Sequence, residues 1–194
     1  MAQRAAIQVT EFIHNIEDQL RLTSQVQDLM DLDPDQARIT LSRLLSYKDV
    51  FEEVALVDST GQELARVSRL AAVTAADLRD RSQSDEYLTP MASGETYFGL
   101  TSFETETGQP HLTMAVPIMD AASGMVTGML VAEVRLKAIW DLVAGIRVGQ
   151  GGSAYIVGAL GNVIAHPNPS LVLRGTRFDA VSYTHLTLPT ILLV

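Results

Sequence analysis

The sequence contains no cysteine and has few basic residues, and each shortage removes a class of function. Without cysteine the chain can form no disulfide, no thiolate nucleophile and no cysteine-ligated zinc site. Its 14 Lys and Arg residues stand against 23 Asp and Glu, which gives a formal net charge of −9. No basic surface large enough to neutralise nucleic-acid phosphates is therefore expected. The same charge disfavours an anionic membrane surface as a partner.

Long hydrophobic runs are also missing. No run of about 18 apolar residues is present, so no membrane-spanning helix is predicted. The first six residues lack the apolar core of a signal peptide, so an extracytoplasmic location would need an anchor or export signal outside this sequence. Hydrophobic residues make up 47% and charged residues 19% of the 194 residues, which indicates one or two folded domains.

Motifs for catalysis, metals and cofactors are absent. His14, His111 and His166 have no metal-ligand spacing such as His-x-x-x-His. The glycine-rich stretch 149–152 precedes a predicted strand, whereas a dinucleotide-binding loop follows a strand into a helix. No serine-hydrolase signature is present. We therefore predict no enzyme activity, no metal site and no cofactor.

Residues 1–46 show the apolar spacing of helices. Residues 5 to about 30 predict one long amphipathic helix whose other face is polar. Asp33 and Pro34 predict the start of a second helix, with Asp33 as the cap and Pro34 at the first helical position, and this helix runs to about Ser46. The expected buried stripe of the first helix is Phe12, Ile13, Ile16, Leu20, Val26 and Leu29, and that of the second is Ile39, Leu41, Leu44 and Leu45.

From Phe51 onward the apolar spacing changes to that of strands. Residues 54–58 and 63–68 flank a turn at 59–62 and predict a hairpin. A polar segment, 74–94, predicts a helix and a loop, broken at Pro90 and Gly94. Three further strands are predicted at 97–104, 112–119 and 126–136. Helices followed by consecutive strands indicate an α+β fold with one antiparallel sheet.

An internal repeat begins after a short predicted helix at 137–146. VALVDSTGQELAR (54–66) aligns with AYIVGALGNVIAH (154–166) at a shift of 100 positions. Identical residues fall at positions 57 and 157, 61 and 161, and 65 and 165, with apolar residues matched between them. The shared strand-turn-strand pattern favours duplication of a module.

These blocks resemble the double Cache sensor domain, in which two PAS-like modules follow a long helix. The resemblance rests on VALVDSTGQELARVS (54–68), on the strand block 97–136 and on GGSAYIVGALGNVIAHPNPSLVLRG (151–175). It covers about residues 5–179, and Gly158 departs from the acidic residue often found at its position. It implies an α+β fold with the long N-terminal helix packed on a PAS-like antiparallel-sheet module, followed by an incomplete second PAS-like module.

The resemblance also implies a function. Domains of this family lie outside the cytoplasmic membrane, in the periplasm, and the long helix carries the ligand signal inward. The membrane-distal module, here residues 47–136, holds a small ligand such as an amino acid, carboxylate or amine. The output domain is of the histidine kinase, chemoreceptor or nucleotide cyclase type. The resemblance is also compatible with a homodimer through the N-terminal helix.

The alternative is a PAS-like interaction or dimerisation spacer that binds no small ligand. A distal pocket lined by convergent polar groups would favour sensing, and a closed core would favour the spacer.

Family members that sense amino acids carry an Arg, a Trp-Tyr pair, a Tyr-x-Asp strand motif and a final Asp. Aligned on this chain, the Arg falls on Ser84 and the Trp-Tyr pair on Glu86-Tyr87. The strand motif falls on Ser102-x-Glu104, and the final Asp falls on Glu133. The Arg that would clamp an α-carboxylate is missing. An ordinary α-amino acid is therefore disfavoured, and a cationic or amine-bearing ligand is the alternative.

Glu133 is the strongest candidate for a ligand contact. It lies in the strand sequence MLVAEV (129–134), where neighbours on both faces are apolar and a bare carboxylate is costly to bury. The alternative is a partly solvated strand end, or a pairing with Arg66 or Arg135. The other candidate ligand-binding residues are Tyr87, Tyr97, Glu104 and Thr113, with ordinary packing as the alternative for the tyrosines and an exposed charge for Glu104.

The composition changes abruptly after Asp179. The stretch VSYTHLTLPTILLV (181–194) carries no charged residue, and its first ten residues resemble the translated read-through of a transposase adapter used in sequencing libraries. We therefore interpret it as a non-native tail, with a native strand as the alternative. Residues 137–180 would then be a connecting helix and the start of a truncated membrane-proximal module. Because this module would expose a sheet edge and apolar side chains such as Ile156 and Ile164, we expect it to be poorly ordered or docked on the first module.

Overall fold

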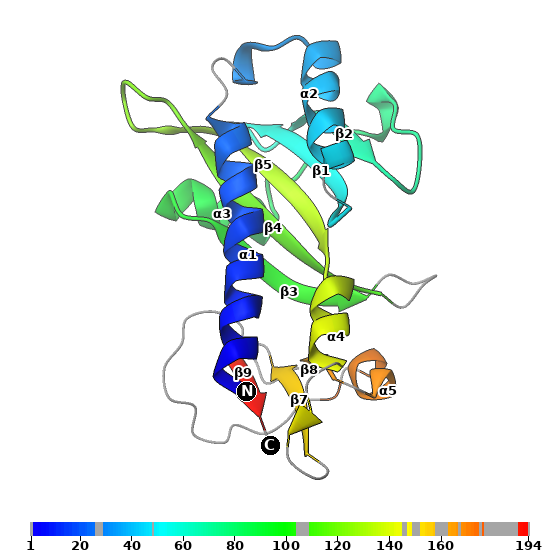
Figure 1. Cartoon of the computed structure of the whole chain (residues 1–194). Coiled ribbons are helices and arrows are strands. Elements are labelled where there is room, and N and C mark those ends of the chain that lie inside the picture. The colour runs from blue at the N-terminus through cyan, green and yellow to red at the C-terminus, as the bar shows by residue number, and fades with distance from the viewer. Residues whose placement is uncertain are drawn as a thin grey trace. The chain divides into compact units, whose positions relative to one another are not determined.

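The computed structural model describes residues 2–25, 29–47, 49–103, 109–144, 147–148, 152–157, 163–166, 168–174, 176 and 190–193. The chain divides into two compact units, whose elements are labelled in Figure 1. We call Asn15–Gly99 with Leu112–Arg135 the sheet unit. We call Met1–His14 with Leu100–His111 and Leu136–Val194 the terminal unit.

A five-stranded sheet with the order β2-β1-β5-β4-β3 forms the centre of the sheet unit. β1 lies inside the sheet and pairs antiparallel with both β2 and β5. The strands are β1 (Phe51–Asp58), β2 (Glu63–Ser68), β3 (Tyr97–Phe103), β4 (Pro110–Met119) and β5 (Val126–Arg135). Their positions match the five predicted strands, and with the long helix they confirm the predicted α+β, PAS-like architecture.

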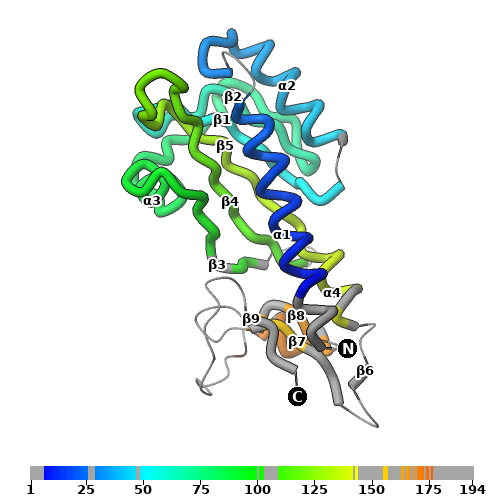
Figure 2. Tube along the Cα trace, turned by 60° about the vertical axis from the view of Figure 1, so that its left-hand side comes forward, coloured from blue at the N-terminus to red at the C-terminus, as the bar shows by residue number. Residues whose placement is uncertain are grey.

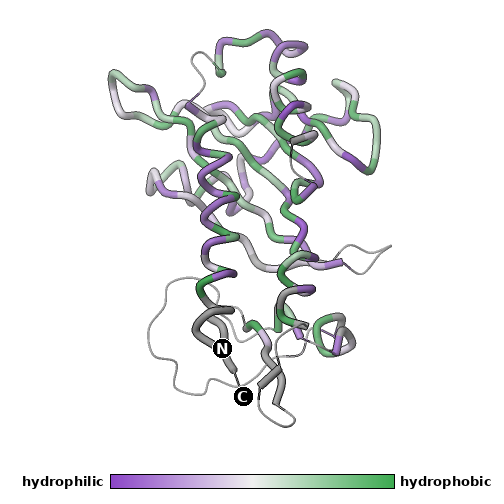
Figure 3. Tube along the Cα trace, viewed as in Figure 1, coloured by the Kyte–Doolittle hydropathy of each residue, from purple (hydrophilic) through white to green (hydrophobic). Residues whose placement is uncertain are grey.

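The long N-terminal helix is α1 (Ala2–Ser24), and Figure 3 shows hydrophilic and hydrophobic positions alternating along it. Its buried stripe is Val9, Ile13, Ile16 and Leu20, while Phe12 is only half-buried. The helix ends at Ser24, earlier than predicted, and in its last turn the Ser24 hydroxyl donates to the Arg21 carbonyl oxygen at 2.8 Å. A short 3₁₀ turn, η1 (Leu29–Asp31), follows with Leu29 buried, and Val26 lies outside the described residues.

The second helix, α2 (Pro34–Tyr47), begins where Asp33 and Pro34 predict it. Asp33 Oδ1 accepts the N–H groups of Asp35 and Gln36, both at 3.0 Å, which is the predicted cap. The prediction that Ile39 is buried is wrong, since its exposed fraction is 54%. The buried face carries Ala37, Leu41, Leu44 and Leu45, and Ile39 lies about 200° around the helix from Ala37.

The segment before β3 contains a 3₁₀ turn, η2 (Ala75–Asp77), and the helix α3 (Asp85–Ser93). In Figure 2, α3 lies on the opposite side of the sheet from α2 and from the part of α1 that belongs to the sheet unit. Pro90 does not break α3 as predicted, because burial of its ring offsets the lost backbone hydrogen bond. The helix ends at Gly94, whose φ of 70° is the left-handed conformation that glycine favours.

The terminal unit contains a second, smaller sheet in which β7 pairs with β6, β8 and β9. Its elements are α4 (Lys137–Ala144), β6 (Arg147–Val148), β7 (Gly152–Val157), β8 (Val163–Ala165), α5 (Pro169–Leu173) and β9 (Thr190–Leu193). Ile156 is 1% exposed, and β9 and β8 pair with β7. The expected exposure of Ile156 is therefore wrong, because its side chain is buried within the terminal unit, where α4 contacts β7. The Ile164 side chain lies outside the described residues.

The predicted repeat is confirmed by strand register. Leu56 pairs with Ala65 and Val57 with Glu63, and the register shifts between these two pairs. One hundred positions later Ile156 pairs with Ala165 and Val157 with Val163, with a register shift at the same point. Two hairpins with the same irregularity at the same place support duplication of one module.

Among the described residues, no helix has both the length and the apolar character needed to cross a membrane.

Candidate functional site

One face of the five-stranded sheet collects most of the predicted site residues. Residues paired across antiparallel strands share a face, and the register pairs Val57 with Met129, Ala55 with Val131 and Glu53 with Glu133. Ala115 of β4 belongs to the same buried cluster as Val57, Met129 and Val131. We call this surface the α3 face, because Tyr87 and Met91 of α3 pack on it together with Tyr97 at the start of β3.

The α3 face has two different ends. Around Val57, Ala115, Met129 and Val131 it is apolar and 0–3% exposed, and Tyr87, Met91 and Tyr97 cover it. Toward Glu53 and Glu133 it carries charge, because the register places these two carboxylates directly opposite each other on β1 and β5. Like charges opposite each other destabilise a sheet by about 0.2–1 kcal/mol unless other groups compensate.

Glu133 is partly buried and has one hydrogen-bond partner in the described part of the chain. The Thr113 hydroxyl donates to Glu133 Oε1 at 3.0 Å, which brings these two predicted residues together. Burial raises the pKa of Glu133 above its ordinary value of 4.5, and the negative charges of Glu53 and Glu86 raise it further. The Thr113 hydrogen bond and the charge of Arg81 act in the opposite direction.

The alternative pairings considered for Glu133 do not occur among the described residues. Arg66 contacts Glu53 and Glu63 instead, and Arg135 donates to the backbone oxygen of Asp49. The second carboxylate oxygen of Glu133 therefore keeps its acceptor capacity for another group.

The two candidate tyrosines, Tyr87 and Tyr97, lie on the same face. The Tyr87 hydroxyl donates to the Ser59 carbonyl oxygen at 2.8 Å, which ties α3 to the β1–β2 turn. Burial raises the pKa of Tyr97, as do the nearby charges of Asp85 and Glu86. Glu104, the fifth candidate, lies outside the described residues.

A network of buried charges borders Glu133, and most of it was missed in the sequence analysis. Its centre is Arg81, whose Nε lies 2.7 Å from Glu63 Oε1 and whose Nη1 lies 3.0 Å from Glu86 Oε1. Arg66 lies 3.3 Å from Glu53 and 3.2 Å from Glu63. The side chains of Arg66, Arg81 and Glu63 are 6%, 9% and 0% exposed. At such burial each charge needs its partner, so the network is a fixed part of the fold.

Arg81 reaches the network because its segment packs on the β1–β2 turn. Gly61 has φ of 90°, and a Cβ built there would lie 2.5 Å from Ser82 Cα. The Arg81 N–H donates to the Gly61 carbonyl oxygen at 2.7 Å, and the Glu63 N–H donates to the Arg79 carbonyl oxygen at 3.0 Å. Only glycine allows this close approach, so Gly61 positions Arg81 over β2.

Negative charge is in excess on this part of the face. Four carboxylates, those of Glu53, Glu63, Glu86 and Glu133, accompany the two buried guanidinium groups. Arg79 adds a third positive charge 3.6 Å from Glu53 but is 58% exposed. Glu133 is the one carboxylate of the four that forms no ion pair within the described residues. The arrangement therefore favours a positively charged group beside Glu133.

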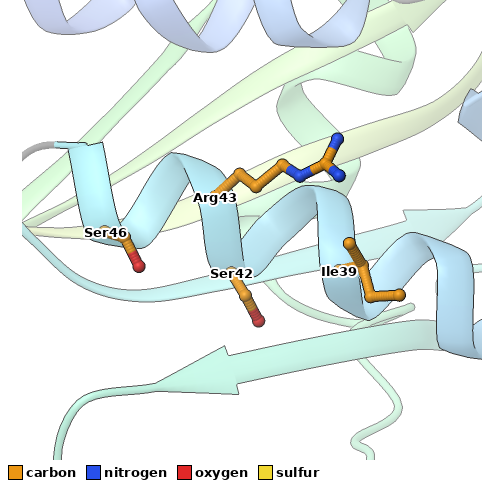
Figure 4. A pocket seen from close by; sticks show the side chains of 4 residues that line it. All are labelled: Ile39, Ser42, Arg43 and Ser46. Carbon is orange, nitrogen blue, oxygen red and sulfur yellow. The ribbon is translucent and has the colours of Figure 1, made fainter.

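Other candidate sites in the described residues carry less chemistry. No group of three or more His, Asp or Glu residues there could hold a metal ion. A shallow hollow of about 480 Å³ lies along α2, lined by Ile39, Ser42, Arg43 and Ser46 (Figure 4). A smaller cavity of about 130 Å³ lies between the start of α2, β2 and residues 73–78. Glu133, Thr113, Tyr87 and Tyr97 line neither of these two.

The chain matches a known family over nearly its whole length. A family model for the Cache domain, dCache_1, matches residues 1–187. The chain therefore belongs to the double Cache family of sensor domains, as its sequence predicts. No curated protein matches the chain significantly.

Solved structures with the same fold are sensor domains of bacterial receptors. The ligand-binding domain of the Pseudomonas aeruginosa PAO1 amino acid chemoreceptor PctC, in complex with GABA, has a TM-score of 0.69 and 18% identity over 90% of this chain and 76% of its own. The sensory domain of the Campylobacter jejuni chemoreceptor Tlp3 has a TM-score of 0.69 and 15% identity, with coverage of 88% and 70%. The Pseudomonas fluorescens CtaA domain, in complex with L-isoleucine, has a TM-score of 0.63 and 18% identity, with coverage of 89% and 68%. At these identities the likeness establishes the fold.

Proposed function

We propose that this chain is the extracytoplasmic small-molecule sensing domain of a membrane receptor. It passes ligand binding to a cytoplasmic output domain of the histidine kinase, chemoreceptor or nucleotide cyclase type. The full-length receptor is anchored in the cytoplasmic membrane, and this domain lies in the periplasm and catalyses no reaction. Membership of the Cache family supports this proposal.

The proposed ligand site is the charged end of the α3 face. Glu133 receives a cationic or ammonium group of the ligand, and Thr113 holds Glu133 in place through the 3.0 Å hydrogen bond. Tyr87 and Tyr97 supply aromatic surface from α3 and β3, on which an ammonium or its alkyl chain can pack. Glu104 follows Phe103 of β3 and is kept as a further candidate. GABA and L-isoleucine, bound by the PctC and CtaA domains, each carry an ammonium group together with a carboxylate, and the proposed ligand shares the ammonium group.

One observation carries the proposal more than any other. Glu133 is partly buried, lies opposite Glu53 and has no ion-pair partner among the described residues. A buried carboxylate in this position destabilises the free domain, so a cation that pairs with it gains affinity from relieving that cost.

A thermal-shift screen of the whole chain tests the proposal. The panel contains primary amines, amino acids, carboxylates and nucleobases, and binding to the native state should raise the melting temperature by mass action. We expect amine-bearing compounds to give the shifts and Glu133→Gln to abolish them. Glu95→Gln, which removes an exposed carboxylate of the same unit, serves as the control and should leave them unchanged. Shifts that survive in Glu133→Gln would contradict the proposed site.

The second candidate function is a dimerisation spacer without a small ligand. Two observations favour it: Tyr87, Met91 and Tyr97 already cover the apolar end of the α3 face, and Ile7 and Leu22 of α1 are 54% and 67% exposed. An exposed apolar pair on a long helix suits a homodimer through that helix. A well-folded domain that dimerises and gives no thermal shift with any compound would support this function over sensing.

A further inference from the structure

Arg81 is the basic side chain best placed to receive a negatively charged part of a ligand. Its charge acts on Glu133 across the α3 face, as the effect of Arg81 on the pKa of Glu133 indicates. Its guanidinium is, however, already surrounded by carboxylates of the protein. Nε faces Glu63 at 2.7 Å, Nη1 faces Glu86 at 3.0 Å and Nη2 faces Glu53 at 3.8 Å.

The three carboxylates around Arg81 differ in how firmly the fold holds them. The Glu63 side chain is fully buried and also accepts the Arg79 N–H at 2.9 Å, so it belongs to the framework. Glu53 is shared with Arg66 and Arg79. Glu86 stands in the first turn of α3, is 21% exposed, and makes its ion pair only with Arg81 among the described residues. Glu86 is therefore the partner that Arg81 can exchange with least damage to the fold.

Glu86 also belongs to the proposed site by its position. Its charge raises the pKa of both Tyr97 and Glu133, and the next residue, Tyr87, packs on the α3 face. The Glu86 carboxylate therefore lies 3.0 Å from Arg81 and belongs to the residue that precedes a tyrosine of the face.

We propose that Glu86 is a specificity-determining residue that occupies Arg81 in place of a ligand carboxylate. The site then selects a cationic ligand, such as a primary amine, over its carboxylate-bearing analogue. The carboxylate of the analogue would be repelled by the Glu86 carboxylate and could not bind Arg81, which is already paired with Glu86. This inference rests on the proposed function, since it concerns the ligand of the same site.

The test compares three compounds of equal chain length by calorimetry: an alkylamine, the corresponding amino acid and the corresponding carboxylate. The wild-type domain should bind the amine more tightly than the amino acid. In Glu86→Ala, Nη1 of Arg81 loses its partner and can bind the added carboxylate. The affinity ratio should therefore shift toward the amino acid by about tenfold or more, the value of one charge-assisted hydrogen bond. Glu86→Gln should shift it less, because the amide oxygen still accepts from Arg81. Glu95→Ala is the matched control and should leave the ratio unchanged.

A second measurement is independent of whether the natural ligand is an amine. Acetate is titrated into the domain while the side-chain N–H signals of Arg81 are followed by NMR. We expect them to move with acetate in Glu86→Ala and to stay fixed in the wild type. If amines bind the wild type but neither the ratio nor the Arg81 signals respond to Glu86→Ala, the role of Glu86 is refuted while the sensing proposal stands. If the Arg81 signals respond but no compound of the panel binds, the sensing proposal fails and the occupancy of Arg81 by Glu86 is supported.

Discussion

The two copies of the repeated hairpin have the same backbone pattern and different chemistry. In the first copy Leu56 pairs with Ala65, and in the second Ile156 pairs with Ala165, with a register shift beside each pair. The apolar residues that set the register are buried in both, with Leu56 and Ile156 at 0% and 1% exposed. The two copies therefore share the buried apolar residues that accompany this register.

The polar positions of the hairpin distinguish the copies. Glu63 corresponds to Val163, which is 1% exposed, and Arg66 corresponds to His166, whose Nδ1 accepts the Asn168 N–H at 2.8 Å. In the first copy these positions bind Arg81 and Glu53, whereas in the second they serve packing and a local turn. A few charged residues therefore make the first copy of the hairpin part of a candidate binding face, while the core pattern is the same in both copies.

The largest effect is expected from giving the first hairpin the residue of the second, Glu63→Val. Arg81 and Arg66 would lose their most buried partner, and breaking a buried ion pair on one side costs about 3–5 kcal/mol. The free energy of unfolding, measured by urea denaturation, should fall by that amount. Glu95→Val, at an exposed site, should change it by less than about 0.5 kcal/mol. A loss below about 1 kcal/mol in Glu63→Val would show that the network is not a fixed part of the fold.

A smaller effect is expected at the turn that brings Arg81 to β2. Gly61→Ala places a methyl group against Ser82 and strains a backbone with φ of 90°. Gly124→Ala is the matched control, because Gly124 has φ of 68° but no neighbour within 4 Å of the added Cβ. We expect about 1–2 kcal/mol of destabilisation in Gly124→Ala from strain alone, and clearly more in Gly61→Ala. Equal losses in urea denaturation would mean that the contact with Ser82 is unimportant.

The smallest effect concerns Glu133 and depends on pH. Its pKa is raised in the folded domain, so the folded state binds more protons than the unfolded state between pH 4.5 and the raised value. The ionised carboxylate therefore destabilises the domain as pH rises through that window. Glu133→Gln, which keeps the acceptor for Thr113, should be more stable than wild type at neutral pH by about 0.2–1 kcal/mol.

The wild-type domain and Glu133→Gln should have the same free energy of unfolding below pH 4.5. Denaturation series at several pH values measure the difference directly. A wild-type domain that is the more stable of the two at neutral pH would show that Glu133 is compensated by a group of the protein, and would weaken its assignment as a ligand contact.

Local patterns in the sequence predict much of this fold. The turn 59–62, the Asp33 cap and the strand carrying Glu133 are all encoded by neighbouring residues, and each lies where it was predicted. The spacing of residues predicted burial and helix ends less well at two single positions, Ile39 and Pro90. Ile39 fits the apolar spacing of α2 but lies outside its buried face. The predicted break at Pro90 is wrong, and the Pro90 ring is buried within α3.

Glu133, Thr113, Tyr87 and Tyr97 share one face of the sheet, and their contact with a ligand stays a prediction. Arg81 could not be predicted, because it stands in the polar run Arg79–Ser84, which reads as a solvated loop. Its burial arises from a tertiary contact, the packing of Ser82 on Gly61, that no local pattern records. The one available signal was Arg66, a charge inside β2 on the same face as Glu133, which required a buried partner.

A crystal structure of the domain grown with the tightest-binding amine from the screen would locate the ligand on the α3 face or elsewhere. We expect an amine nitrogen within about 3.2 Å of the free Glu133 oxygen, with Thr113 still bound to the other oxygen and Arg81 still bound to Glu86. An amine bound elsewhere, for example in the hollow along α2, with Tyr87 and Tyr97 closed over Glu133, would contradict the proposed site.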